Sequence, residues 1–386
     1  MSKKKVLWHS NSPLAGTGYG NQTYIFSKIL KEAGYDVTIS ATYGLSGSSI
    51  EFDGITILPR GLDKAGNDVL GAHYEVLKPD ILFTLIDSWI LNPNIISKLP
   101  LAVWTPIDHD PVPPKVTEVM DAISFPVAMS KFGESALRDE GVDPYYIPHG
   151  VVTNIFEPKD KTEARKRFKV EDDVFVAIMN AANKGYPCRK SFESVLKAWK
   201  AFTDKHPRSI LYMHTLPVEN FGGLDFDAAL KFYHLDRGQV RFPNMYKYVM
   251  GEYKWDFLVD MYNMADVLLA PSMGEGFGIP VVEAHACGCP TIVTDFSAQA
   301  ELGATYKIPI NRFDDLRIMP QRSEQAFVLP SQILAGLEWV YNHEHPEQLR
   351  EQAREAAMPY DALVVFERYM QPVFEAIADI TAIQNA

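Results

Sequence analysis

Two carboxylates and three glycines lie within residues 274–283, directly after an apolar run at residues 267–270. Glycines let a backbone approach a ligand closely, and Pro280 suits the first position of a helix. The free amides at a helix start attract a phosphate or a polar sugar edge. Glu275 in the loop and Glu283 about one turn into the helix can therefore face one ligand from two sides. A plain connector with a favourable helix-start charge is the alternative interpretation of this segment taken alone.

A second group of polar residues, Asp108, His109 and Asp110, follows the apolar run at residues 101–104. Loops at strand ends line the ligand site of such sheets, so we expect His109, or the adjacent Asp108, to reach a ligand. A lone histidine otherwise serves as a structural hydrogen-bonding group. Two acids beside a histidine also raise the question of a metal site, but no further ligands stand at usable spacing.

Residues 16–20 hold three glycines, which invites comparison with a dinucleotide-binding turn. The third glycine is one position early, Asn21 stands in its place, and no acidic residue closes the second strand, so we reject NAD binding. The geometry of the turn alone can account for the three glycines.

Apolar runs alternate with helical spacing along the chain, which predicts two parallel sheets covered by helices. The first series has expected strands at residues 5–9, 37–41, 55–58, 81–85, 101–104 and 123–127, with a helix at 21–33. The second has expected strands at residues 174–179, 210–214, 267–270 and 291–294, with helices at 191–205 and from Pro280. A stretch with Pro and Gly at residues 147–158 separates the two series.

The length of 386 residues exceeds the roughly 250 to 300 at which one core stops growing. We therefore predict a domain of residues 1–150, joined by a C-terminal helix at 360–386, and a second domain of residues 151–359. The net charge of −12 works against tight nonspecific binding to DNA or anionic membrane. Three cysteines do not form a disulfide framework, and no signal peptide or 18-residue apolar run is present. We expect a cytoplasmic protein without a membrane span.

Residues 270–290 resemble the E-x7-E signature of glycosyltransferase family four, a group of retaining enzymes with the GT-B fold. Further segments resemble the family in the same order, namely residues 128–133, 147–156, 258–272 and 294–302. The resemblance thus spans most of the chain. It implies an α/β protein of the GT-B class, with two Rossmann-like domains facing each other across a cleft, the first on the acceptor side and the second on the donor side.

The resemblance also implies roles for the residues of the glycine-rich turn. Glu275 would lie at the donor sugar near the reacting carbon, and Glu283 would bind the ribose of the nucleotide. The backbone amides of Gly276, Phe277 and Gly278 would contact the sugar hydroxyls. In the first domain, His109 matches a histidine that often contacts the donor in this family. A glycine turn such as that of Gly18 and Gly20 would approach the donor phosphates and the acceptor.

The family keeps an Arg or Lys and, about six positions later, a Lys for the diphosphate of the donor. Lys184 and Lys190 match that spacing, and Arg189 competes for the role. Fixed cations suit this chemistry because a departing nucleoside diphosphate concentrates negative charge. A solvated helix start is the alternative for a charge run taken alone.

These assignments predict retaining transfer of a hexosyl or other sugar from a nucleoside-diphosphate sugar to a hydroxyl acceptor. Glu275 and His109 would stabilise the positively charged sugar, and the departing phosphate would accept the proton. No metal or other cofactor is required, because the cations offset the diphosphate charge. The alternatives are a sugar-nucleotide epimerase on the same fold and a non-catalytic nucleotide-sugar binding protein. The acceptor stays open among polysaccharide, lipid, protein, small molecule and modified nucleic acid.

Overall fold

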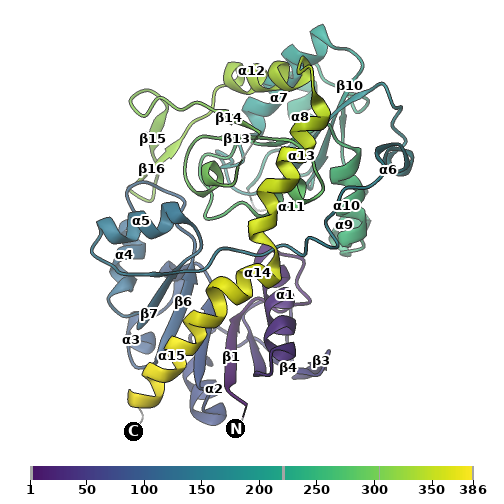
Figure 1. The fold of residues 1–386 in the computed structure, drawn as a ribbon. Coiled ribbons are helices and arrows are strands. Elements are labelled where there is room, and N and C mark those ends of the chain that lie inside the picture. Colours follow the sequence, from purple (N-terminus) through teal and green to yellow (C-terminus); the bar gives the residue numbers. More distant parts are fainter. Residues whose placement is uncertain (1–2, 220–221, 304, 385–386) are drawn as a thin grey trace. The chain divides into compact units, whose positions relative to one another are not determined.

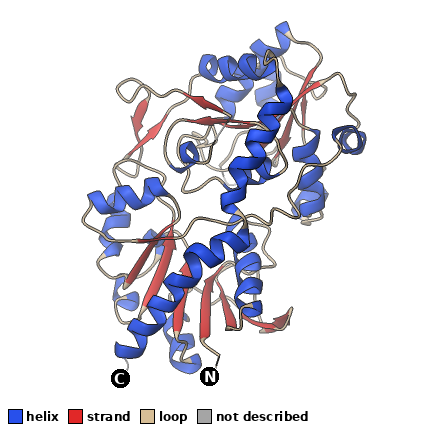
Figure 2. Cartoon of the chain, viewed as in Figure 1, coloured by secondary structure: helices blue, strands red, loops and turns tan. Residues whose placement is uncertain are grey.

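The computed structural model describes residues 3–219, 222–303 and 305–384, and the chain forms two compact units (Figure 1). Each unit is a sheet with helices packed against it (Figure 2). Unit 1 comprises Met1–Val152, Pro320–Ser323 and Tyr360–Ala386, and unit 2 comprises Thr153–Met319 and Glu324–Pro359. The expected boundary at residue 150 falls two residues before the end of the first segment of unit 1. Residues 1–2 and 385–386 of the predicted first domain lie outside the described residues.

Unit 1 holds an eight-stranded sheet in the order β3-β4-β2-β1-β5-β6-β7-β8. Its strands are β1 (Lys5–Ser10), β2 (Asp36–Ala41), β3 (Ile50–Phe52), β4 (Ile55–Leu58), β5 (Ile81–Leu85), β6 (Leu101–Thr105), β7 (Phe125–Ala128) and β8 (Tyr145–Tyr146). Its helices are α1 (Gly18–Glu32), α2 (Leu70–Leu77), α3 (Pro93–Ile96), α4 (Pro114–Met120), α5 (Lys131–Asp139), α14 (Ala362–Val365) and α15 (Gln371–Gln384), with the short 3-10 turn η1 (Ser88–Ile90) and the π-helical segment η4 (Phe366–Met370).

The first sheet departs from the expected parallel arrangement at its edge, where β3 pairs antiparallel with β4. Asp53 and Gly54 connect the two strands, and both have positive φ angles, of 50° and 68°. Such a two-residue turn matches the twist of a hairpin, and Asp-Gly is a preferred sequence for it. The sequence analysis did not predict β3, whereas the strands that it did predict in this sheet pair in parallel.

The core of unit 1 is aromatic and joins the sheet to the C-terminal helix. Trp8 of β1 and Phe83 of β5 have ring centroids 4.9 Å apart, and Trp104 of β6 lies 5.9 Å from Phe83. Phe374 of α15 packs on the same Phe83 ring at 4.9 Å. Buried aromatic side chains contribute large apolar areas, so this contact attaches α15 to the sheet of unit 1.

Unit 2 holds a six-stranded parallel sheet in the order β11-β10-β9-β12-β13-β14. Its strands are β9 (Phe175–Asn180), β10 (Ser209–His214), β11 (Val240–Arg241), β12 (Val267–Ala270), β13 (Thr291–Thr294) and β14 (Tyr306–Ile308), beside an antiparallel pair β15 (Leu316–Ile318) and β16 (Glu324–Ala326). Its helices are α6 (Lys161–Phe168), α7 (Phe192–Lys205), α8 (Phe226–Phe232), α9 (Met245–Val249), α10 (Trp255–Met264), α11 (Ile279–Ala286), α12 (Pro330–Tyr341) and α13 (Pro346–Ala357), with the short turn η2 (Ala298–Glu301).

Helix α7 shows why the predicted elements of unit 2 form. Its apolar side chains recur at helical spacing, and Val195, Leu196, Trp199 and Phe202 are fully buried in the core of the unit. Strands β12 and β13 have the predicted bounds, because each is a short apolar run closed by turn residues. The three cysteines are free thiols. No helix within the described ranges 3–219, 222–303 and 305–384 has the length and apolar character needed to cross a membrane.

Candidate functional site

The candidate donor residues of unit 2 lie at the carboxyl edge of its sheet. Strand β12 ends at Ala270 and continues into the glycine-rich loop, and β9, which ends at Asn180, is its parallel neighbour. Helix α11 follows the first of these loops and α7 follows the second. Parallel strands present their carboxyl ends at one edge, so loops far apart in the sequence meet there.

Gly278 shapes the start of α11. Its φ of 114° lies in the region that L side chains rarely adopt, and an added Cβ would stand 3.1 Å from Leu302 Cδ1. Phe277 beside it is buried. The backbone conformation at position 278 therefore favours glycine, and an added Cβ would also require the Leu302 side chain to shift.

Replacing Gly278 by alanine is expected to lower the free energy of unfolding by about 1–3 kcal/mol, because the new side chain forces a disfavoured φ angle. Urea denaturation of the ligand-free protein measures this change. Gly16→Ala is the matched control, since a Cβ at Gly16 meets nothing within 4 Å. Equal stability of the two variants would contradict the prediction.

Glu275 lies between two cations of the loop that precedes α7. Its Oε2 is 2.9 Å from Arg189 Nη1, and its Oε1 forms an ion pair with Lys190 Nζ. Arg189 also donates to the carbonyl of Gly274, and the Glu275 amide donates to Ser297 Oγ at 2.8 Å. The Glu275 side chain is 13% exposed. The structure thus joins three residues that the sequence analysis had named separately.

The two cations decide the charge of Glu275. Burial alone would raise the pKa of this carboxyl, but the charges of Arg189 and Lys190 outweigh burial and lower the pKa to about 2. Glu275 is therefore an anion across the physiological pH range. Its carboxylate pairs with the cations that were expected to hold a diphosphate.

Lys184, the third candidate cation, has an exposed side chain. Its neighbour Asn183 is buried and shapes the loop, donating to the carbonyls of Leu224 at 2.7 Å and Leu216 at 3.2 Å. Asn183 also accepts from the Leu224 amide at 2.8 Å. The sequence analysis missed this role, which depends on contacts some forty residues away and gives no local signal.

Glu283 is buried inside α11, where Tyr262 of α10 donates a hydrogen bond to its Oε2 at 2.8 Å. Burial raises the pKa of Glu283 to about 7, while the hydrogen bond from Tyr262 acts in the opposite direction. The two carboxylates of the motif therefore differ in electrostatic setting: Glu275 is paired with cations, and Glu283 has a neutral hydrogen-bond donor.

In unit 1, Asp108 and His109 lie in the loop after β6. His109 Nδ1 and Asp108 Oδ1 are 2.6 Å apart, His109 is buried, and the Asp108 side chain is 29% exposed. A carboxylate bonded to one ring nitrogen fixes the orientation of the imidazole. The sequence named both residues as alternatives, and the structure joins them as a pair.

Gly18 and Gly20 do not lie in a turn before the first helix, as we expected, but inside the first turn of α1. Thr17 caps this helix by accepting from the Gly20 amide at 3.0 Å, so α1 begins three residues before the predicted start at residue 21. An added Cβ at Gly20 would lie 2.2 Å from the carbonyl oxygen of Ala15. Gly20 thus permits close packing of the preceding loop against the helix.

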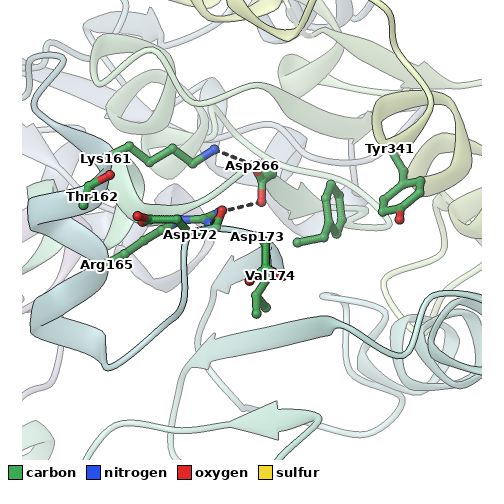
Figure 3. Close-up of a pocket in the computed structure, with 9 residues that line it drawn as sticks. Lys161, Thr162, Arg165, Asp172, Asp173, Val174, Asp266 and Tyr341 are labelled. Carbon is green, nitrogen blue, oxygen red and sulfur yellow. Dashed lines mark hydrogen bonds and ion pairs between the residues drawn. The ribbon is translucent and has the colours of Figure 1, made fainter.

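A pocket of about 300 Å³ lies at the opposite, amino edge of the sheet in unit 2 (Figure 3). Lys161 and Arg165 of α6 both pair with Asp266, the residue that precedes β12. Arg165 also donates to the carbonyls of Glu171 at 3.1 Å and Asp172 at 2.5 Å. These contacts attach α6 to the starts of β9 and β12. We therefore interpret Lys161, Arg165 and Asp266 as residues that stabilise the fold. None of the predicted site residues lines this pocket.

Solved structures establish the fold class. The chain is similar to sucrose-phosphate synthase from Thermosynechococcus elongatus, with a TM-score of 0.73 at 15% identity, covering 97% of this chain and 99% of that one. It is also similar to Anabaena Alr3699/HepE in complex with UDP-glucose, with a TM-score of 0.69 at 13% identity, covering 96% and 99%. The protein therefore has the predicted GT-B fold, with parallel sheets in two Rossmann-like domains.

Sequence comparison adds a likeness over part of the chain. Residues 247–355, which contain Glu275 and Glu283, match the family model described as "Glycosyl transferases group 1". The D-inositol 3-phosphate glycosyltransferase of Geodermatophilus obscurus is 29% identical over 157 residues, 39% of this chain and 33% of that protein. The matched part spans between a third and a half of the relatives' own length.

Proposed function

We propose that this protein is a retaining glycosyltransferase that moves a sugar from a nucleoside-diphosphate sugar to a hydroxyl group of an acceptor. The observation that carries the proposal is the cluster of Glu275, Arg189 and Lys190 at the carboxyl edge of the unit 2 sheet, with Glu283 in the following helix. The match of residues 247–355 to glycosyl transferases group 1 supports it.

The donor binds by exchanging one anion for another. Its diphosphate takes the place of the Glu275 carboxylate beside Arg189 and Lys190, where charge-assisted hydrogen bonds hold it. The released carboxylate then stabilises the positive charge that develops on the reacting carbon of the sugar. Glu283 accepts hydrogen bonds from the ribose hydroxyls.

In the transfer step the acceptor oxygen forms a bond to the reacting carbon while the bond from that carbon to the phosphate oxygen breaks. Both events occur on one face of the sugar, so its configuration is retained. The departing phosphate takes the proton of the acceptor hydroxyl, and Arg189 and Lys190 offset the growing negative charge. The proposed step uses no metal. The roles expected of Asp108, His109, Gly18 and Gly20 stay predictions.

The first test is a panel of UDP-glucose, GDP-mannose and ADP-glucose scored for thermal stabilisation. One donor at a hundred times its Kd is expected to stabilise the fold by about 2.7 kcal/mol, because it binds only the folded state. UDP-glucose is the first choice, since it is bound in the Anabaena neighbour. The same donor should release nucleoside diphosphate when acceptors are supplied as cell extracts.

Each contrary result has a defined meaning. An epimerised donor without net nucleotide release would replace transfer by epimerisation, and tight binding without transfer to any extract would indicate a binding protein. The absence of a response to every donor would overturn the proposal. Glu283→Ala is the matched variant, because it should reduce the thermal shift while leaving the cation cluster in place.

A further inference from the structure

A chain of hydrogen bonds runs from the carboxyl end of β9 to the buried carboxylate of α11. Asn180 Nδ2 donates to the Tyr262 hydroxyl at 2.8 Å, and this hydroxyl donates to Glu283 Oε2 at 2.8 Å. Tyr262 is fully buried and Glu283 is 6% exposed. A phenol has one proton, so the bond accepted from Asn180 leaves that proton directed at Glu283.

We propose that Tyr262 and Asn180 are positioning residues that favour the ionised form of Glu283, which accepts hydrogen bonds from the ribose hydroxyls of the donor. This inference rests on the proposed function, in which Glu283 binds the ribose. An ionised carboxylate accepts hydrogen bonds through both oxygens, whereas in a protonated carboxyl one oxygen carries the proton and acts as a donor. Two ribose hydroxyls, both acting as donors, therefore bind best to the ionised form.

Tyr262 donates a hydrogen bond directly to the Glu283 carboxylate, and the charged and titratable groups of the neighbouring elements must be compared with it. Helix α13 supplies Arg350 and Arg354, which donate to the carbonyls of Cys287 and Ala286 at the end of α11, at 3.5 Å and 2.5 Å. The titratable neighbours on the helix itself are the buried Cys287 and His285, the latter bonded to Thr291 Oγ1 at 2.8 Å. Strands β12 and β13 bring only apolar residues and threonines.

The hydrogen bond from Tyr262 thus stabilises a charge that burial opposes. Burial raises the pKa of Glu283 to about 7, and the bond from Tyr262 limits that rise. Removing the bond should raise the pKa further, so that less of Glu283 is ionised at neutral pH. Asn180 acts on Glu283 indirectly, because it orients the Tyr262 hydroxyl through a hydrogen bond.

The test is the titration of Glu283 in the ligand-free full-length protein carrying glutamate labelled with ¹³C at the side-chain carboxyl. The Glu283 signal is assigned by its loss in Glu283→Gln. In Tyr262→Phe its midpoint should move up by about one pH unit, because a hydrogen bond to the charged form is lost. Asn180→Ala should move the Glu283 midpoint in the same direction by a smaller amount. This variant provides the test if Tyr262→Phe does not fold. Tyr212→Phe, which removes a hydroxyl from β10 of the same unit, should leave the Glu283 midpoint in place.

The second readout is the affinity for UDP between pH 6 and pH 9. If the midpoint rises from about 7 to about 8, the ionised fraction at pH 7 falls from about a half to about a tenth. Tyr262→Phe should then bind UDP about fivefold more weakly than the unchanged protein at pH 7 and nearly equally at pH 9. A merely structural role of Tyr262 would weaken binding equally at both pH values.

The two proposals fail in different ways. An unmoved Glu283 midpoint in both Tyr262→Phe and Asn180→Ala overturns the positioning role, whatever the protein binds. A shifted midpoint together with no binding of UDP, GDP or ADP by the unchanged protein upholds the hydrogen-bond relay and overturns the nucleotide site.

Discussion

Glu275→Gln is expected to bind free nucleoside diphosphate about tenfold or more tightly than the unchanged protein, while transferring sugar about 100-fold to 1000-fold more slowly. The carboxylate lies against Arg189 and Lys190, so a diphosphate must displace it before binding. Glutamine keeps the shape but removes the negative charge that competes with a diphosphate for Arg189 and Lys190. The slower transfer follows because a neutral amide stabilises a developing positive charge poorly.

Calorimetric titration with UDP, GDP and ADP, and with pyrophosphate alone, measures the first effect, and single-turnover kinetics with saturating donor measure the second. Glu283→Gln is the contrasting variant, expected to weaken nucleotide binding and leave pyrophosphate binding unchanged. A Glu275→Gln protein with unaltered affinity for pyrophosphate would contradict the competition between anions. Unaltered transfer at saturating donor would remove Glu275 from the reaction.

The motif around Glu275 and Glu283 was predictable because its signals are local. An apolar run, a glycine-rich loop and a proline at a helix start specify β12 and α11 without reference to the rest of the chain. The two parallel sheets were equally predictable, since the alternation of strands and helices extends over the whole sequence. The GT-B class itself came from the resemblance of residues 270–290 and the other matching segments to glycosyltransferase family four. The antiparallel pairing of β3 with β4 was also encoded, in the turn residues Asp53 and Gly54, but the sequence analysis overlooked that signal.

The partners of the two carboxylates could not be predicted in the same way. Lys190 lies 85 positions before Glu275, and Tyr262 lies 21 positions before Glu283, on another helix. Their proximity follows from the pairing of β9 with β12 and the packing of α10 on α11, which no local pattern records. The spacing that favoured Lys184 likewise gave no indication that the loop would carry this side chain outward while Asn183 fixed the loop from inside.

Lys190→Met is expected to lower the rate of transfer by about 100-fold or more, and Arg189→Met by less. Lys190 is the more enclosed cation, with a side chain 20% exposed against 37% for Arg189, and electrostatic stabilisation is stronger where water is excluded. Methionine retains most of the aliphatic stem, so packing changes little. Lys184→Met is the matched control and should stay within about twofold, because its exposed charge is screened by solvent.

The pH dependence of stability checks the same ion pair without any donor. The pKa of Glu275, lowered to about 2 against an ordinary value of 4.5, means that its ion pairs stabilise the fold above pH 4.5 and are lost as pH falls toward 2. Lys190→Met removes one of the two charges that lower this pKa. Its free energy of unfolding, measured in urea, should therefore fall less steeply between pH 5 and pH 3 than that of the Lys184→Met control. If Lys184→Met instead shows the flatter pH profile and the slower transfer, Lys184 is the residue that binds the diphosphate. Only a charge coupled to Glu275 can change both the pH dependence of stability and the rate of transfer.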